Sequence, residues 1–174
     1  MVSILIASLI AVKEEAYSRT MKVATICPSD KLTWSPLPDA LTLGQLLRHM
    51  HRSEYNRMRV LNGLIEPATY YVLRHGEGQA RDLKATLGDV TDLDAELTAL
   101  QEAHRYTLQA FGGLSDEDLT RRADWGGKTR TTLEFLFLMF EHDAHHRGQV
   151  ATYLRLLGVE RPMGMDWRGL AYGK

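Results

Sequence analysis

The chain has 174 residues, 44% hydrophobic and 25% charged, which predicts one domain over residues 1–174 with a sizeable buried core. Its 21 basic and 22 acidic residues give a net charge of -1, so neither nucleic acid nor a membrane surface is an expected partner. The single cysteine, Cys27, excludes an intrachain disulfide and a thiolate metal cage, and it predicts a reducing, cytoplasmic location.

The first predicted element is a helix over residues 2–26. It ends before Pro28, because proline disfavours the helical conformation in the residue that precedes it. The apolar run over residues 2–12 lacks the basic residues of a signal peptide and is too short to cross a bilayer, which takes roughly 20 residues. We therefore expect this run to be the first half of a buried core or interface helix.

The second predicted helix begins at Thr42, where Gln45 completes a capping box, and it ends near Gly63. A loop containing Trp34 comes before it. Residues 66–90 contain three glycines and little apolar periodicity. They predict a short helix and a connection more mobile than the long helices.

The third long helix is predicted to begin at residues 91–92 and to stop at the glycine pair 112–113. After it, Ser115 and Asp118 have the spacing of the cap of a single-turn helix. Residues 124–130, which contain two glycines, predict a turn before the last long helix.

The fourth helix begins at Thr131, which forms a capping box with Glu134, and it ends at Leu157 before the stop signal of Gly158. Residues 133–140 are apolar on nearly every side of this helix. Such a segment lies inside a bundle or against a second subunit.

Four long helices with one long connection between the second and the third predict an all-α fold, a four-helix bundle. The apolar runs 2–12 and 133–140 together present more apolar surface than the inside of one small bundle can absorb. They therefore predict a homodimer.

Histidines interrupt the apolar surface of the fourth helix. At about 100° per residue, His142 and His146 stand about 40° apart, so both can reach one metal ion from one face. His145 points about 100° away from His146 and is not expected to bind the same ion. Asp143 also points away from His142, and an arginine such as Arg48 or Arg147 is its expected partner.

Two imidazoles make a weak site, so a third ligand must come from elsewhere in the chain. His49 and His51 of the second helix lie about 200° apart, so only one of them can face the centre of the bundle at this level. Periodicity alone leans slightly toward His51. His104, in the third helix, is a further candidate that reads better as a core histidine, and His75 lies in the glycine-containing connection.

Two other chemistries fit less well. His142, Asp143 and His146 imitate the H-E-x-x-H frame of zinc proteases, but Asp143 is one methylene shorter than the glutamate that acts there as general base. Cys27 precedes a proline with no histidine nearby in sequence, which argues against a nucleophilic triad.

The chain resembles the DinB/YfiT-like family, whose members look like metal-dependent enzymes. The resemblance spans about residues 1–162 in element order and rests on three segments: Asp30-Lys31-Leu32-Thr33-Trp34-Ser35-Pro36, then Thr42-Leu43-Gly44-Gln45-Leu46-Leu47-Arg48-His49-Met50 with Glu54, and His142-Asp143-Ala144-His145-His146-Arg147-Gly148-Gln149. Residues 66–90 match nothing specific in the family.

The resemblance implies an up-down-down-up four-helix bundle, in which His49, His142 and His146 hold a divalent metal ion with one position left to water. It thus favours His49 over His51. Zinc is the first choice of metal, with nickel, iron or manganese as alternatives. Arg147 and Gln149 also match the family, and we expect them to serve helix packing or hydrogen bonding to a ligand histidine.

Two enzymatic functions on a small-molecule substrate follow from this resemblance. One is metal-dependent hydrolysis, and the other is transfer or isomerisation with a low-molecular-weight thiol as cosubstrate. Glu54, Glu141 and Asp143 are near enough in sequence to be considered as a general base. The alternative is a non-catalytic bundle that binds a metal ion or a small ligand. An open metal position facing solvent would favour an enzyme, and a sealed one would favour a structural site.

Overall fold

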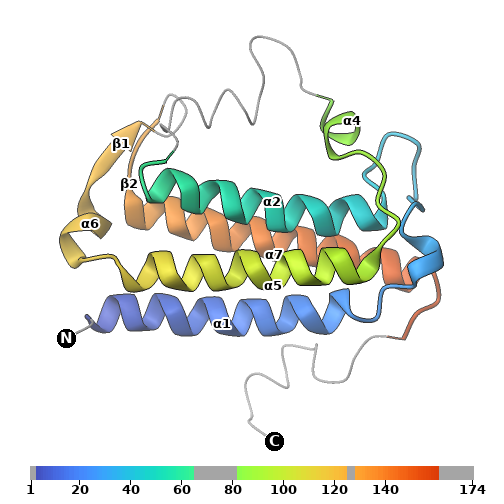
Figure 1. The fold of residues 1–174 in the computed structure, drawn as a ribbon, viewed down its shortest axis with the longest axis horizontal. Coiled ribbons are helices and arrows are strands. Elements are labelled where there is room, and N and C mark those ends of the chain that lie inside the picture. Colours follow the sequence, from blue (N-terminus) through green and yellow to red (C-terminus); the bar gives the residue numbers. More distant parts are fainter. Residues whose placement is uncertain (1–2, 65–81, 125–127, 161–174) are drawn as a thin grey trace, which may run out of the picture.

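The computed structural model describes residues 3–64, 82–124 and 128–160. Four long helices lie side by side (Figure 1): α1 (Ile4–Ala24), α2 (Leu43–Leu61), α5 (Leu93–Gly112) and α7 (Thr132–Leu156). The shorter elements are a 3-10 turn (Ser29–Lys31), α4 (Leu83–Leu87), α6 (Asp116–Thr120) and the strands β1 (Arg122–Asp124) and β2 (Thr129–Thr131).

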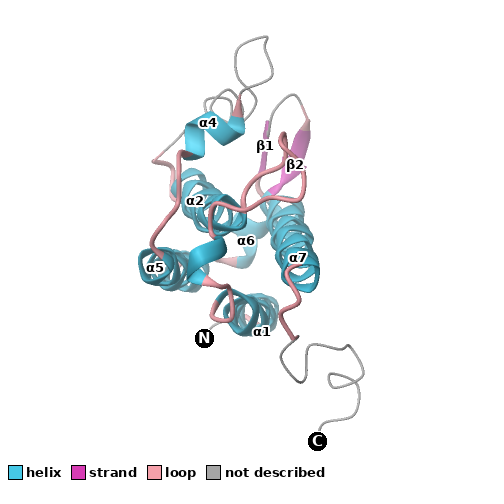
Figure 2. Cartoon of the chain, turned by 90° about the vertical axis from the view of Figure 1, so that its right-hand side faces the viewer, coloured by secondary structure: helices cyan, strands magenta, loops and turns pink. Residues whose placement is uncertain are grey.

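The four long helices occupy the corners of a square in the end-on view (Figure 2). α2 packs on α5 and α7, and α1 packs on the same two helices, so α1 and α2 face each other across the centre. α1 and α7 run in one direction, and α2 and α5 run in the other (Figure 1). This order confirms the expected up-down-down-up four-helix bundle. Within the described residues, no helix is long and apolar enough to span a membrane.

Local capping chemistry sets the helix starts. Thr42 and Thr131 each accept a hydrogen bond from the backbone three residues later and close a capping box, as the sequence predicted. Ser115 does the same for α6, with Asp118. α1 ends at Ala24, two residues earlier than predicted.

Two of the predicted connections differ in how far the structure describes them. Of the predicted turn at residues 124–130, residues 125–127 lie outside the described residues. On either side of them, β1 and β2 pair antiparallel, with Arg122 opposite Thr131. Of the predicted mobile connection over residues 66–90, residues 66–81 lie outside the described residues. Its last part forms the expected short helix, α4, and Leu87 and Val90 are buried there.

The core has two apolar layers with a polar layer between them. One layer lies at the end of the bundle that holds the C-terminus of α1 and includes Val23, Leu46 and Leu154. The other lies at the opposite end and includes Leu9, Phe111 and Met139. Between them, each long helix contributes buried or half-buried polar side chains: Lys13, His49, Glu54, Arg57, His104, Thr107, His142, Asp143 and His146. Buried polar groups need partners, so this layer is where a functional site belongs.

Gly44 lies where α2 meets the segment after α4. A Cβ added there would be 2.6 Å from Cβ of Val90 and 3.1 Å from the carbonyl oxygen of Leu32. We expect Gly44→Ala to lower the free energy of unfolding by about 1–3 kcal/mol, because overpacking outweighs the better helix propensity of alanine.

Gly148→Ala is the matched control, since Gly148 is also helical but has nothing within 4 Å of an added Cβ. It is expected to stabilise the protein by up to about 1 kcal/mol. Urea unfolding of both variants tests this, and a stabilising Gly44→Ala would contradict it.

Candidate metal centre

Three histidine side chains meet between α2 and α7. Nε2 of His142 lies 3.1 Å from Nε2 of His49 and 3.1 Å from Nε2 of His146. One ring nitrogen from each residue lies within 4.8 Å of the others. The structure therefore brings together the three residues that the family resemblance implied. All three side chains are partly exposed, so the cluster is accessible from outside the bundle.

The donor set fits a cation. Oε1 of Gln149 accepts a hydrogen bond from Nδ1 of His146 at 2.7 Å, which leaves Nε2 of His146 with a free lone pair. Three such nitrogens turned toward one another cannot all be satisfied by one another, because a neutral ring carries a single N–H. A divalent ion between them would satisfy all three.

Electrostatics keeps these rings in the form that binds metals. Burial lowers the pKa of His142 to about 4, and it also lowers the pKa of His146. Both imidazoles are therefore neutral at pH 7. Neutral imidazole is the protonation state that donates a lone pair to a metal ion.

The other histidines lie elsewhere. His51, which periodicity slightly preferred, faces α5 and lies 2.7 Å from a carboxylate oxygen of Glu96. His145 is exposed on α7 and is not a member of the cluster. His104 is a core histidine that stacks on Tyr17 with the ring centroids 3.8 Å apart. His75 lies outside the described residues.

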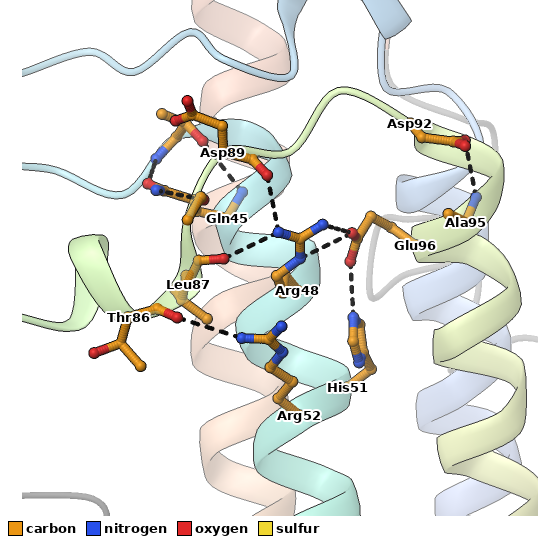
Figure 3. Close-up of polar contacts among 12 residues, drawn as sticks. Gln45, Arg48, His51, Arg52, Thr86, Leu87, Asp89, Asp92, Ala95 and Glu96 are labelled. Carbon is orange, nitrogen blue, oxygen red and sulfur yellow. Dashed lines mark hydrogen bonds and ion pairs between the residues drawn. The ribbon is translucent and has the colours of Figure 1, made fainter.

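Glu96 belongs to a polar clamp that attaches the segment around α4 to the bundle (Figure 3). Arg48 donates hydrogen bonds to Glu96 and to the carbonyl oxygens of Leu87 and Asp89. One turn earlier on α2, Gln45 donates to two further carbonyl oxygens of the same segment. The motif residues Gln45 and Arg48 therefore serve the fold.

The clamp gives a prediction for pH dependence. Burial alone would raise the pKa of Glu96, but the hydrogen bonds from His51 and Arg48 outweigh it and lower the pKa. We expect Glu96→Gln to reduce the free energy of unfolding at pH 7 by about 1–3 kcal/mol. Because the pKa of Glu96 is depressed in the folded protein, this difference is present above the unfolded value of about 4.3 and is lost as the pH falls through the folded value.

Urea unfolding of the wild type and Glu96→Gln between pH 7 and pH 3 measures this convergence. Glu102→Gln, at an exposed position of the same helix, is the control and should change stability little. A difference between wild type and Glu96→Gln that stays constant down to pH 3 would contradict the prediction.

A buried ion-pair cluster lies beside the histidines. Nζ of Lys13 lies 2.7 Å from Oδ2 of Asp143 and 2.9 Å from Oε1 of Glu54, and Thr107 donates a 2.7 Å hydrogen bond to the same oxygen of Glu54. Burial alone would lower the pKa of Lys13, but the two carboxylates more than offset it and raise the pKa. Burial alone would raise the pKa of Asp143, but the charge of Lys13 outweighs it and lowers the pKa to about 2.

This cluster corrects the expected partner of Asp143. The partner is Lys13, not Arg48 or Arg147, because Lys13 crosses the centre of the bundle from α1. Arg147 instead donates to the carbonyl oxygen of Ala16. The sequence contained a signal for Lys13, because it stands in register with the buried Ile6, Leu9 and Thr20. A charged residue in an apolar stripe indicates a buried partner.

Asp143 also connects the ion pairs to the histidines. Its Oδ1 lies 3.8 Å from Nδ1 of His142, and neither atom has a hydrogen-bond partner within the described part of the chain. A carboxylate behind a ligand histidine fixes the orientation of the ring and keeps Nε2 as the donor atom. The ion-pair cluster thus lies directly behind His142.

Comparisons with known proteins bear on the family and the fold. The sequence model of the DinB family matches residues 3–172. Among solved structures, a DinB-like protein from Bacillus cereus ATCC 10987 is 22% identical, with a TM-score of 0.65 over 84% of this chain and 89% of that chain. The DinB-like protein YjoA from Bacillus subtilis is 19% identical, with a TM-score of 0.65 over 90% and 96%.

A third solved structure is YfiT from Bacillus subtilis, described as a probable metal-dependent hydrolase with an unusual four-helix bundle topology. It is 19% identical, with a TM-score of 0.64 over 92% of both chains. At these identities the likeness shows the fold. The comparison with curated proteins gave no match.

Proposed function

The chain belongs to the DinB family, and from this premise we propose that it is a divalent-metal-dependent hydrolase of a small molecule, with His49, His142 and His146 as the metal ligands. The description of YfiT as a probable metal-dependent hydrolase supports the reaction class. Zinc is our first choice of metal, because it is the commonest ion at sites of three histidines.

The convergence of three Nε2 atoms at a partly exposed position is the observation that carries this proposal. Structural zinc sites have four protein ligands, whereas catalytic sites have three and keep one position for water or substrate. When bound, such an ion supplies a water molecule of pKa near 7 and polarises an oxygen of the substrate.

The surrounding residues have supporting roles in this proposal. Gln149 holds the ring of His146 by the hydrogen bond at Nδ1, and Asp143 lies behind His142. Glu54 and Asp143 both form ion pairs with Lys13, so we assign them a positioning role and not that of a general base. Glu141 is exposed on α7.

Metal analysis followed by an activity screen tests the proposal. The protein is purified without a histidine tag, its metals are measured, and the zinc-loaded form is assayed on ester, amide and phosphoester substrates with and without a low-molecular-weight thiol. Hydrolysis that needs the metal supports the proposal, with His49→Ala as the inactive variant and His51→Ala as its active control. Turnover only with the thiol would replace it by a thiol transferase, and metal binding without turnover would replace it by a non-catalytic bundle.

We also propose that residues 1–174 act as one domain, since the family match covers nearly all of them. A cytoplasmic location is the second part of this proposal. Cys27 is buried, and burial raises the pKa of its thiol to about 12, which makes the thiol unreactive. Because Cys27 is the single cysteine, the fold does not depend on an intrachain disulfide and suits a reducing compartment.

A homodimer through α1 and α7 is our proposal for the assembly. These helices pack on each other and carry exposed apolar side chains, among them Ile4 at 87% and Phe137 at 56% exposure. We expect sedimentation at micromolar concentration to show a dimer, and Phe137→Glu to shift it toward monomer. Leu37→Glu, at an exposed loop position, is the control that leaves the dimer intact. A wild-type protein that sediments only as a monomer would contradict the proposal.

A further inference from the structure

Arg57 is a buried cation in the polar layer of the bundle. It lies on α2 and is only 2% exposed. Its Nη1 is shielded from solvent without a hydrogen-bond partner, and within the described residues no carboxylate lies within ion-pair distance of the guanidinium. Arg48 on the same helix shows the usual arrangement, with acceptors around its guanidinium (Figure 3).

Arg57 lies on the same helix as His49, and its position directs the side chain toward the level of the three histidines. Eight residues separate it from His49, which corresponds to about 80° around the helix and about 12 Å along it. Long side chains in helices lean toward the N-terminus, and this brings the guanidinium back toward the level of His49.

A buried guanidinium without acceptors is costly, because it cannot lose its proton and has given up its hydration. The two buried carboxylates of this layer, Glu54 and Asp143, are both paired with Lys13 and not with Arg57. A divalent ion at the histidines would add two positive charges, and an anionic ligand would offset them.

We propose that Arg57 binds a carboxylate of the substrate while the reacting group of the substrate lies at the three histidines. A planar carboxylate matches the fork of the guanidinium with two parallel hydrogen bonds and would satisfy Nη1, which lacks a partner. The inference rests on the proposed function, and it predicts that the substrate is a small carboxylic acid.

Thiols that differ in a carboxylate test the proposal in the cobalt-substituted protein, where a bound thiolate changes the visible spectrum. The probes are 3-mercaptopropionate and 4-mercaptobutyrate, with 2-mercaptoethanol as the neutral reference. At least one acid is expected to bind about tenfold to a hundredfold more tightly than the reference. Arg57→Met should abolish this preference without changing the affinity for 2-mercaptoethanol, and Arg57→Lys should keep part of it. Arg48→Met, the matched control, should keep all of it.

A second measurement needs no metal ion. In the metal-free protein, Arg57→Met should raise the Tm by about 2–8 °C, because it removes an unsatisfied buried cation. Arg48→Met should lower the Tm, because it removes the partner of Glu96. A fall in Tm for Arg57→Met as large as that for Arg48→Met would show that Arg57 serves the fold and would overturn the inference.

The outcomes separate the two proposals. Equal binding of the acids and 2-mercaptoethanol to wild type would overturn the role of Arg57 and leave the open metal position standing. A cobalt spectrum that no thiol changes would overturn the open position, and with it both proposals.

Discussion

Replacing any one of His49, His142 or His146 by alanine is expected to remove most of the metal that the purified protein binds. Two imidazoles hold a divalent ion poorly, so the loss of one ligand should weaken binding by orders of magnitude. Elemental analysis after dialysis against metal-free buffer measures the bound metal in each variant. Because the three Nε2 atoms lie together, the three variants should behave alike.

His51→Ala and His145→Ala are the matched controls, since each lies within three residues of a proposed ligand and neither belongs to the cluster. Both should retain the wild-type metal content. Loss of metal in His51→Ala with retention in His49→Ala would show that the helical wheel was right and the family resemblance wrong. Retention of metal in His146→Ala would refute the site.

Thermal stability should show the same division. A metal ion that binds only the folded state adds a binding free energy to its stability. In metal-containing buffer the three ligand variants should therefore melt at lower temperature than the wild type, whereas in chelator the difference should be small. A ligand variant that is equally destabilised in both buffers would indicate a role in packing instead.

Lys13→Met is expected to lower the free energy of unfolding by about 3–5 kcal/mol. Lys13 is 2% exposed and is the shared partner of Glu54 and Asp143, so its removal leaves two buried carboxylates without their ion-pair partner. Methionine fills a similar volume and keeps the loss of packing small. Urea unfolding of the metal-free protein at pH 7 measures the effect without a contribution from metal binding.

Lys31→Met is the matched control for this substitution. Lys31 also forms an ion pair, with Asp30, but both side chains are exposed, and such pairs contribute at most about 1 kcal/mol. A loss for Lys13→Met as small as that for Lys31→Met would mean that the two carboxylates become protonated or hydrated without penalty. The ion-pair cluster would then not be essential to the polar layer.

The helix ends and the paired histidines could be predicted from the sequence because both depend on residues close together in the chain. A capping box needs only a threonine and a side chain three residues later, as at Thr42 and Thr131. His142 and His146 share a face because four residues are close to one helical turn. Such features do not depend on which helix is a neighbour.

Periodicity alone could not choose between His49 and His51 as the proposed third ligand. α2 packs on α5 along one side and on α7 along another, so His49 and His51 both contact a neighbouring helix although they point in nearly opposite directions. A helical wheel that measures the distance from the centre of one apolar stripe cannot distinguish two such contacts. The placement of α7 beside His49 agrees with the family resemblance, which favoured His49 over His51.

The polar layer was likewise decided by the tertiary structure. Lys13, Glu54 and Asp143 come from three helices, and 130 residues separate Lys13 from Asp143 in the chain. Each occupies a position that looks apolar by periodicity, and the sequence marks that position as unusual without naming its partner. The partners exist because α1 faces α2 across the centre of the bundle and lies beside α7, a packing in which the charges can satisfy one another out of water.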